Sequence, residues 1–581
     1  MKIRTVLLLL IAAIVFVGVV GALMLWRAGD APTLASRSIL EIDLTQGFAE
    51  DTPPDRFALS LLERKPRLRE VVSAFHWAAE DDDIVGVLAK VGATPGGLGT
   101  LQELRDAVLR FRESGKTALA YAETFGEFGA ANGGYYLASA FDRIYLQPSG
   151  DVGLTGLYYE VPFLAGTLDK LGVKAQIGQR YEYKNAPNTY TQKGFTEAHA
   201  EAMQALLDSQ FSQIVRGIAQ RRSLDERTVR QLFDDGPHFG VEALEAGIVD
   251  QLAYRDEVYD AAKEEFGEDA AYRDLVDYRG GSVLGLRGAE TIGLIYGVGG
   301  IIRGTGGYDP LTGSVYMGAD TVAKAFRDAV DDDSVKAILF RVDSPGGSYV
   351  ASDTVWRETL RADQAGKPVI VSIGDVAGSG GYFVSMSAAR IIAQPGSITG
   401  SIGVYGGKLV SGGLWDKLGM TFDSVASSEN AEIWSGVREF DERGWSRMQD
   451  SLDRIYRDFV AKVAEGRSLA PEAVERVARG RIWTGEHAVE NGLVDELGGF
   501  PVAYAAIRDE LGLEEDSPLR LKIFPRPKST WETFFDRLSE LDTGARSAAR
   551  LAGLARVGAL LRELGLSLGG QGVLEMPFVP E

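Results

Sequence analysis

The chain has 581 residues, of which 45% are hydrophobic and 25% are charged, proportions that are ordinary for a globular protein. This length allows two large domains with well-filled cores. The formal net charge of −21 argues against a nucleic-acid partner, because binding to phosphates requires concentrated Lys and Arg. The sequence contains no cysteine, which excludes a thiol nucleophile, a thiolate metal site and a disulfide bond.

The first predicted element is an uncharged apolar segment over residues 5–26. At about 1.5 Å per residue it is long enough to cross a hydrocarbon core of about 30 Å. Lys2 and Arg4 precede it, so the positive-inside rule places residues 1–4 in the cytoplasm and the rest of the chain outside. A cleaved signal peptide is the alternative, although its apolar region usually has only about 7–15 residues. We therefore expect a membrane anchor that contacts the lipid bilayer through residues 5–26.

The first half of the body, residues 37–277, alternates short apolar runs with helix-like stretches. The runs predict buried strands over 39–44, 84–91 and 117–121, and the longer stretches predict helices over 101–113 and 196–221. This alternation is typical of βαβ units, so we expect an α/β fold with a largely parallel sheet.

The second half, residues 289–515, has the same character. We expect strands over 291–296, 335–342 and 368–373, and helices over 354–365, 381–389 and 443–465. The Gly-rich residues 278–288 are interpreted as a linker. Residues 516–581 form a tail in which a peripheral structural helix is the favoured interpretation, and packing on a partner subunit or on the membrane surface is the alternative.

The two halves repeat one another about 250 residues apart. Thr94-Pro-Gly-Gly97 in the first half corresponds to Ser344-Pro-Gly-Gly347 in the second, and Asn132-Gly-Gly-Tyr135 corresponds to Ser379-Gly-Gly-Tyr382. The repeat is far longer than that of a solenoid protein, so it indicates an internal duplication that produced two similar domains.

The copies differ where chemistry would need a particular side chain. The differences are Ser379 for Asn132, Ser401 for Leu154 and Glu429 for Lys184. One copy therefore holds a possible nucleophile and the other holds a possible base. Because neither copy has both, we expect the active site to lie at the interface between them.

Ser379 follows a predicted strand and precedes a predicted helix, in a turn rich in glycine. The free N–H groups at a helix N-terminus stabilise a developing anion, and the glycines let the backbone approach a substrate carbonyl. Gly346 also follows a buried strand, where its N–H group is well placed to join that of Gly380 in an oxyanion hole.

A Ser-His-Asp triad is disfavoured for this serine, although sequence position alone does not exclude one. None of the four histidines lies in a glycine-rich turn, and His199, within a Glu-Ala-His-Ala-Glu stretch, is expected on the solvated surface. Lysine is the remaining known base, provided that burial lowers its pKa from about 10.4 to about 7–8. A surface residue is the ordinary interpretation of a lysine, but the complementary differences between the copies favour a functional role for Lys184.

These motifs resemble the signal peptide peptidase A family, in its long, duplicated, membrane-anchored form. The resemblance extends from the anchor to about residue 500, and its strongest motifs are Asp343–Gly347, Ser379–Tyr382, Thr399–Gly403 and Tyr183-Lys184. The family is related in fold to the Clp protease and crotonase group. The resemblance thus implies two tandem Clp/crotonase-like domains with largely parallel sheets, placed after the N-terminal transmembrane helix.

The resemblance also implies a serine endopeptidase with a Ser/Lys dyad. By motif, Ser379 is the nucleophile, Lys184 is the general base and later the acid, Ser401 orients the lysine, and Gly346 and Gly380 form the oxyanion hole. No metal or cofactor is implied. The implied substrates are cleaved signal peptides and other short or unfolded hydrophobic peptides. The implied assembly is a homotetramer in the bacterial inner membrane, with its catalytic region on the periplasmic side.

Two alternatives remain open from the sequence. A crotonase-like acyl-CoA enzyme would share the fold and the oxyanion glycines, although its proton chemistry usually depends on carboxylates. A non-catalytic membrane scaffold would keep the fold without the chemistry, although the divided set of Ser379 and Lys184 argues against it.

Overall fold

The computed structural model describes residues 37–51, 65–275, 278, 288–308, 314–526 and 574–575. The expected anchor, residues 5–26, lies outside the described residues, as do most of the expected linker and tail. Among the helices that are described, none is both long enough and apolar enough to cross a membrane.

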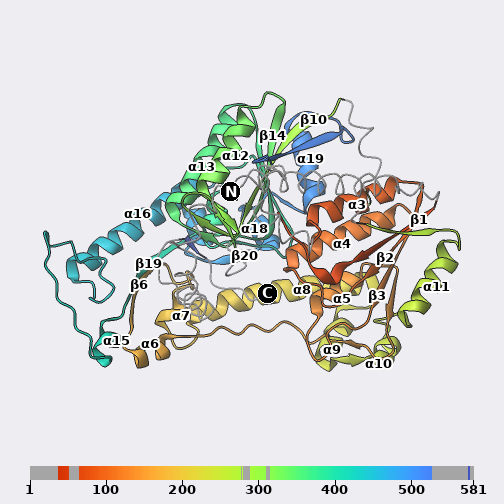
Figure 1. Cartoon of the computed structure of the whole chain (residues 1–581), viewed down its shortest axis with the longest axis horizontal. Coiled ribbons are helices and arrows are strands. Elements are labelled where there is room, and N and C mark those ends of the chain that lie inside the picture. Colours follow the sequence, from red (N-terminus) through yellow and green to blue (C-terminus); the bar gives the residue numbers. More distant parts are fainter. Residues whose placement is uncertain are drawn as a thin grey trace, which may run out of the picture.

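A six-stranded sheet organises the first half (Figure 1). Its strand order is β8-β4-β3-β2-β1-β9, and all neighbouring strands run parallel. The strands are β1 (Ser38–Asp43), β2 (Ile84–Lys90), β3 (Thr117–Ala122), β4 (Arg143–Leu146), β8 (Gln251–Leu252) and β9 (Ala271–Asp274). The parallel sheet that the βαβ pattern predicts is therefore present.

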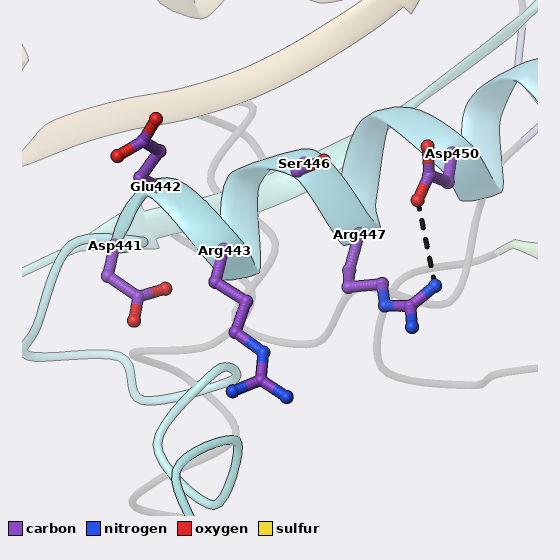
Figure 2. Close-up of a pocket in the computed structure, with 6 residues that line it drawn as sticks. All are labelled: Asp441, Glu442, Arg443, Ser446, Arg447 and Asp450. Atoms are coloured by element: carbon purple, nitrogen blue, oxygen red, sulfur yellow. Dashed lines mark ion pairs between the residues drawn. The ribbon is translucent and has the colours of Figure 1, made fainter.

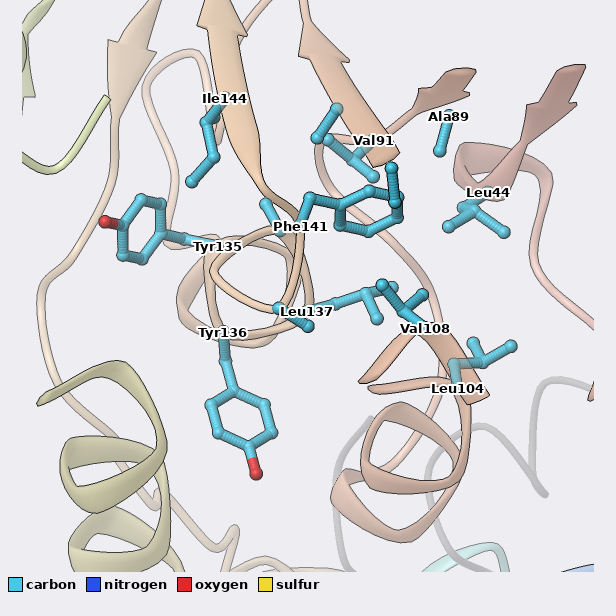
Figure 3. Close-up of a cluster of buried hydrophobic side chains, with 14 of the residues drawn as sticks. Leu44, Ala89, Val91, Leu104, Val108, Tyr135, Tyr136, Leu137, Phe141 and Ile144 are labelled. Atoms are coloured by element: carbon cyan, nitrogen blue, oxygen red, sulfur yellow. The ribbon is translucent and has the colours of Figure 1, made fainter. Parts of the chain in front are cut away.

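Helices cover this sheet and bury its apolar side chains. They are α3 (Leu68–Glu80), α4 (Leu98–Glu113), α5 (Asn132–Ala138), α8 (Glu197–Arg222), α9 (Glu226–Asp235), α10 (Gly240–Glu245) and α11 (Arg255–Phe266). In the core, Leu104 and Val108 of α4 and Leu137 of α5 belong to one buried cluster that also contains strand residues such as Ala89 and Ile144 (Figure 3). Burial on both faces explains why the strands have nearly continuous apolar sequences.

The second half is built around an eight-stranded sheet. Its main path is β20-β18-β16-β14-β10-β22, with β17 beside β16 and β21 beside β17, and only the β18–β20 pair is antiparallel. The strands are β10 (Glu290–Val298), β14 (Val335–Ser344), β16 (Val369–Gly378), β17 (Arg390–Ala393), β18 (Ile398–Gly400), β20 (Ile482–Thr484), β21 (Glu496–Leu497) and β22 (Leu519–Phe524).

Helices and a smaller sheet complete this half. The helices are α12 (Ala319–Val330), α13 (Tyr349–Gln364), α14 (Gly380–Phe383), α16 (Glu442–Gly466), α17 (Pro471–Val477), α18 (Gly485–Glu490) and α19 (Phe500–Glu510). The smaller sheet contains β11 (Gly300–Ile302), β12 (Gly307–Tyr308), β13 (Val315–Gly318), β15 (Gly346–Gly347) and β23 (Leu574–Glu575).

One predicted helix, residues 381–389, is mostly absent. Helix α14 ends at Phe383, and the chain continues in turns. The reason is that Ala389 already donates its N–H to Val369 O, at the start of β16, so the chain must leave the helix to enter β17. The prediction of a long helix here was therefore wrong.

An antiparallel arm joins the two halves and was not predicted. Strand β6 (Lys174–Arg180), from the first half, pairs along its whole length with β19 (Val404–Val410), from the second. Helix α16 packs against both strands, and the arm extends to the left in Figure 1, where α6 (Ala165–Leu171) and α15 (Gly412–Lys417) lie. The arm carries first-half residues 174–180 onto the second half, and Lys184 follows directly.

Candidate active site

Ser379 lies between the end of β16 and the start of α14, fully buried. Its backbone has φ 54° and ψ −111°, a conformation that costs a non-glycine residue about 1–3 kcal/mol. The N–H of Ser379 donates to Gly400 O at 2.8 Å, which ties this turn to β18. The turn thus holds the serine side chain in one fixed direction.

Glycines on both sides of the turn permit a close backbone approach. A Cβ at Gly381 would lie 2.5 Å from Ser344 O, and a Cβ at Gly380 would lie 3.1 Å from the Cα of Gly346. Any larger residue would therefore push the Ser344–Gly347 segment away from the serine turn. This close approach explains the paired glycines that follow Ser379.

Lys184 reaches Ser379 from the other half of the same chain. Its Nζ lies within hydrogen-bonding distance of Ser379 Oγ at 2.7 Å, of Ser401 Oγ at 2.9 Å and of Ser401 O at 3.0 Å. All three side chains are fully buried. The structure thus brings together the three residues that the comparison of the repeats singled out, at a junction between the halves.

The loop that carries Lys184 is held mainly by the second half. Arg479 O accepts the N–H of Tyr181 at 3.3 Å, and the Arg479 guanidinium pairs with Glu182 at 2.8 Å. A Cβ at Gly480 would lie 2.4 Å from Lys184 N, so this glycine lets the two backbones touch. These contacts fix the position of Lys184 relative to the turn that carries Ser379.

The two expected oxyanion glycines are neighbours. Gly346 has φ 105°, which favours glycine, and its N–H donates to Ser344 Oγ at 3.2 Å in this structure. Gly380 is the first residue of α14, where the N–H groups have no acceptor within the helix. Gly346 lies beside Gly380, which directly follows Ser379, and the oxyanion role of both glycines stays a prediction.

An acidic pair beside the serine turn was not predicted. Between Val342 and Ser344 the pairing of β14 with β16 shifts, so that Asp343 faces a bulge containing Asp375. Asp343 accepts the N–H of Val376 at 3.0 Å. Burial, together with the nearby negative charges of Asp375 and Glu50, raises the pKa of Asp343 to about 8. The pair therefore holds a proton at neutral pH.

Asp375 also binds the start of helix α4 in the first half. Its carboxylate accepts the N–H of Gly97 at 3.0 Å, the N–H of Thr100 at 2.7 Å and the hydroxyl of Thr100 at 2.8 Å. Such an anion at a helix N-terminus is favoured by the free N–H groups and the helix dipole. The residue thus fastens the strand before Ser379 to the other half.

Arg341 lies beneath this pair and is fully buried. Its guanidinium binds Glu50 at 2.7 Å and Glu103 at 2.9 Å, two residues of the first half. The sequence signal for this network was present but unused: Arg341 and Asp375 interrupt apolar strand sequences, and a charge in such a run requires a buried partner.

His199 is buried, with 1% of its surface exposed, so its expected position on the solvated surface was wrong. The rings of Phe163 and Phe195 pack edge-on against it at the start of α8. Its burial lowers the pKa of the imidazole to about 4. The charged neighbours Glu197 and Glu201 made the segment resemble an exposed helix face, so the inward direction of His199 was not predicted.

Two hollows in the described part of the chain are lined by residues other than Ser379, Lys184 and Ser401. One of about 570 Å³ lies at the start of α16 and is lined by charged side chains, among which Arg447 and Asp450 pair at 3.7 Å (Figure 2). None of Ser379, Lys184 and Ser401 lines it. Across the described ranges, no three His, Asp or Glu side chains gather as a metal site.

Comparisons with known proteins define the family. The pattern described as "Peptidase family S49" matches residues 110–269 and 361–514, once in each half. The chain is 31% identical over 502 residues to "Serine protease SPPA, chloroplastic" of Arabidopsis thaliana, an alignment covering 85% of this chain and 72% of that protein. It is 32% identical over 520 residues to "Protease 4" of Salmonella typhi, covering 85% and 81%. The chain belongs to peptidase family S49, a family of serine peptidases.

Solved structures were also compared. A point mutant of ClpP1 from Listeria monocytogenes aligns with 37% of this chain and 94% of its own, at 15% identity and a TM-score of 0.23. A point mutant of the 1510-N membrane-bound stomatin-specific protease aligns with 41% of this chain and 98% of its own, at 12% identity and a TM-score of 0.25.

Proposed function

We propose that this protein is a membrane-anchored serine endopeptidase with a Ser379/Lys184 dyad. Its proposed substrates are cleaved signal peptides and other short or unfolded hydrophobic peptides, and its two halves are proposed to be Clp/crotonase-like domains. The observation that carries the proposal is the 2.7 Å contact between Lys184 Nζ and Ser379 Oγ, which is hydrogen-bonding distance for proton transfer.

The proposed reaction follows from this geometry. Neutral Lys184 takes the proton of Ser379 Oγ as that oxygen attacks the substrate carbonyl carbon. The N–H groups of Gly346 and Gly380 hold the oxyanion, which requires that the Gly346 N–H leave Ser344 Oγ. Lys184 then gives its proton to the leaving amine, and water hydrolyses the acyl-enzyme with the lysine as base again.

The surroundings of Lys184 favour the neutral amine that this reaction needs. The side chain is fully buried, and burial in a medium of low polarity disfavours the charged form of an amine. Oxygens of Ser379 and Ser401 lie within 3.0 Å of its Nζ. We propose that Ser401 keeps the amine aimed at Ser379 during both proton transfers.

The proposed setting is the periplasmic face of a bacterial inner membrane, with residues 5–26 as the anchor and a homotetramer as the assembly. Exposed apolar side chains beyond the arm support self-association, since contiguous apolar patches usually mark interaction surfaces. They are Leu418, Met420, Phe422, Val425 and Trp434. Light scattering of the full chain in detergent measures the assembly size directly.

Hydrolysis of a fluorogenic hydrophobic peptide tests the proposal. We expect Ser379→Ala and Lys184→Met each to lower kcat by about 10³-fold or more, because nucleophile and base act as one unit. Lys170→Met, which changes an exposed lysine near the arm, should leave hydrolysis unchanged. If both site variants hydrolyse the peptide at the normal rate, the assignment is wrong. Turnover of acyl-CoA esters without peptide cleavage would instead support the crotonase-like alternative.

A further inference from the structure

One buried carboxyl links the strand that precedes Gly346 to the strand that precedes the candidate nucleophile. Asp343 is the second-to-last residue of β14, and its carboxyl accepts the N–H of Val376 at 3.0 Å. Val376 belongs to β16 and lies three positions before Ser379. The pairing of β14 with β16 shifts at this point, as it does at a β-bulge. The side chain of Asp343 therefore supplies a bond between the two strands where their regular pairing is interrupted.

The chain after Asp343 continues directly to an expected oxyanion donor. Ser344 Oγ accepts the N–H of Gly346 at 3.2 Å and donates to Gly299 O at 2.7 Å. The N–H of Gly299 in turn donates to Asp343 O at 2.8 Å. A Cβ on Gly381 would lie 2.5 Å from Ser344 O, so this segment is in direct contact with the serine turn. A displacement of Asp343 would therefore move Gly346 relative to that turn.

The charged groups around Asp343 are mostly carboxyls. Asp375 faces it from the bulge of β16, and Glu50 faces it from the first half. On β14 itself, two positions earlier, the Arg341 guanidinium binds Glu50 at 2.7 Å and Glu103 of α4 at 2.9 Å. Burial and the negative charges of Asp375 and Glu50 raise the pKa of Asp343 to about 8. The pair of Asp343 and Asp375 therefore shares a proton at neutral pH, because two adjacent buried carboxyls cannot both ionise cheaply.

We propose that Asp343 is a positioning residue for the reaction of Ser379, and that its protonated carboxyl keeps Gly346 in place beside the serine turn. This inference rests on the proposed function and deepens it. While the pair holds its proton, the ends of β14 and β16 stay together. When the pair loses that proton, two buried negative charges repel each other and push the two strand ends apart.

The expected consequence is a loss of activity at alkaline pH. Lys184 must be neutral to accept the proton of Ser379, so the dyad alone would give a rate that rises with pH to a plateau. A displaced Gly346 would weaken a hydrogen bond that forms only in the transition state, so kcat should fall with little change in KM. Because a misplacement of about 1 Å can cost about 10²-fold in rate, we expect kcat to fall at least about tenfold between about pH 7 and about pH 10.

Asp343→Asn in the full chain tests this inference with a fluorogenic peptide. Asparagine keeps an acceptor for the N–H of Val376 and has no proton to lose, so kcat of the variant should not fall between about pH 7 and about pH 10, whatever its value at the lower pH. Circular dichroism at each pH and at the assay temperature shows that the proteins compared are folded. The matched control is Asp142→Asn, which should retain the alkaline fall. The Asp142 carboxyl also accepts a strand N–H, that of Ala118 at 2.9 Å, but it pairs with Arg112 at 2.6 Å.

A measurement without turnover separates this inference from the proposed function. Infrared spectroscopy detects the C=O stretch of a protonated carboxyl. We expect such a band at about pH 7 that Asp343→Asn lacks, and we expect the unaltered protein to lose it by about pH 10. The inference is overturned by the absence of this band, by a kcat that does not fall at alkaline pH, or by a fall that Asp343→Asn retains, and each of these leaves hydrolysis by Ser379 intact. Normal hydrolysis by Ser379→Ala would instead overturn the proposed function.

Discussion

Equivalent positions in the two halves make different side-chain contacts. In the second half Ser379 presents its hydroxyl to Lys184 at 2.7 Å. In the first half the equivalent Asn132 uses its side chain locally, donating to Gly156 O at 2.7 Å and accepting the N–H of Thr155 at 3.0 Å. The equivalent turns therefore differ: the side chain of Asn132 stabilises the local backbone in the first copy, and Ser379 is the candidate nucleophile in the second.

The two Pro-Gly-Gly segments show a second contrast. In the first half, Gly97 and the start of α4 bind the carboxylate of Asp375. In the second half, Gly346 and Gly347 form a strand whose edge pairs with β23. In the first copy, the free N–H groups at the start of α4 are thus occupied by the carboxylate of Asp375 from the second copy. The duplication teaches that the first-half segment stabilises the contact between the halves, whereas the second-half segment pairs with a strand from the end of the chain.

The largest expected effect comes from making the second copy resemble the first. Ser379→Asn should lower peptide hydrolysis by about 10³-fold or more, because the amide cannot act as a nucleophile. The buried turn should remain folded, which thermal unfolding followed by circular dichroism would show. Hydrolysis at more than a tenth of the normal rate in a folded variant would mean that the two copies do not differ as described.

Displacing Lys184 should have the next largest effect. In Gly480→Ala the new methyl group would meet Lys184 N at 2.4 Å, and a misplacement of about 1 Å can cost about 10²-fold in rate. Gly366→Ala is the matched control, since Gly366 also has a positive φ, 74°, but a Cβ there would meet nothing within 4 Å. Equal kcat values in the two variants would show that the lysine position is not set by Gly480.

Removing the Ser401 hydroxyl tests the third difference between the copies. Ser401→Ala should lower kcat about tenfold with little change in KM, because a hydrogen bond to a reacting group contributes about 1.5 kcal/mol. Steady-state kinetics separates the two constants. A change in KM alone would instead assign Ser401 to substrate binding.

Asp343 should make stability depend on pH. Its pKa in the folded chain is raised to about 8, so the folded state holds a proton that the unfolded state releases near the ordinary value of 3.8. The contribution is complete below pH 3.8 and is lost as the pH rises to about 8, by up to about 1.4 kcal/mol per pH unit. Asp343→Asn keeps an acceptor for the N–H of Val376, so its Tm should fall less between about pH 6 and about pH 9. Parallel curves for the two proteins would contradict this.

The smallest effect is expected from Asn132→Ser. It restores a serine to the first copy, but Leu154 stands where the second copy has Ser401, and Lys184 is engaged at Ser379. Peptide hydrolysis should not change, while loss of the two amide hydrogen bonds should lower the free energy of unfolding by about 1–2 kcal/mol. Denaturant unfolding measures this loss, and a second reactive serine at position 132 would refute the interpretation.

The sequence was informative where one physical signal dominated. Buried strands such as 335–342 are mostly apolar runs, and the structure confirms this strand as Val335–Ser344. The arm was missed because β6, with the sequence KAQIGQR, is polar and mostly half-buried, so no periodicity separates it from a loop. Pairing over more than 200 residues of chain cannot be inferred from local pattern.

The candidate site was found by comparing the copies rather than from any single motif. Two signals indicated Lys184: its exchange with Glu429 between the copies, and the resemblance of Tyr183-Lys184 to a family motif. The contact between the halves at Asp375 was not predicted, because its partners Gly97 and Thr100 belong to the other half. His199 escaped because burial by Phe163 and Phe195 depends on tertiary packing.

The central claim is that one active site is shared between the two halves of a single chain. The most direct test is to label the full chain with a fluorophosphonate and to locate the labelled residue by mass spectrometry. Such a probe reacts with an activated serine hydroxyl and releases fluoride. We predict one labelled residue, Ser379, and a labelling rate that falls about 10³-fold in Lys184→Met, since the base lies in the other half. Labelling of Ser379 at an unchanged rate in Lys184→Met, or labelling at another serine instead, would contradict the claim.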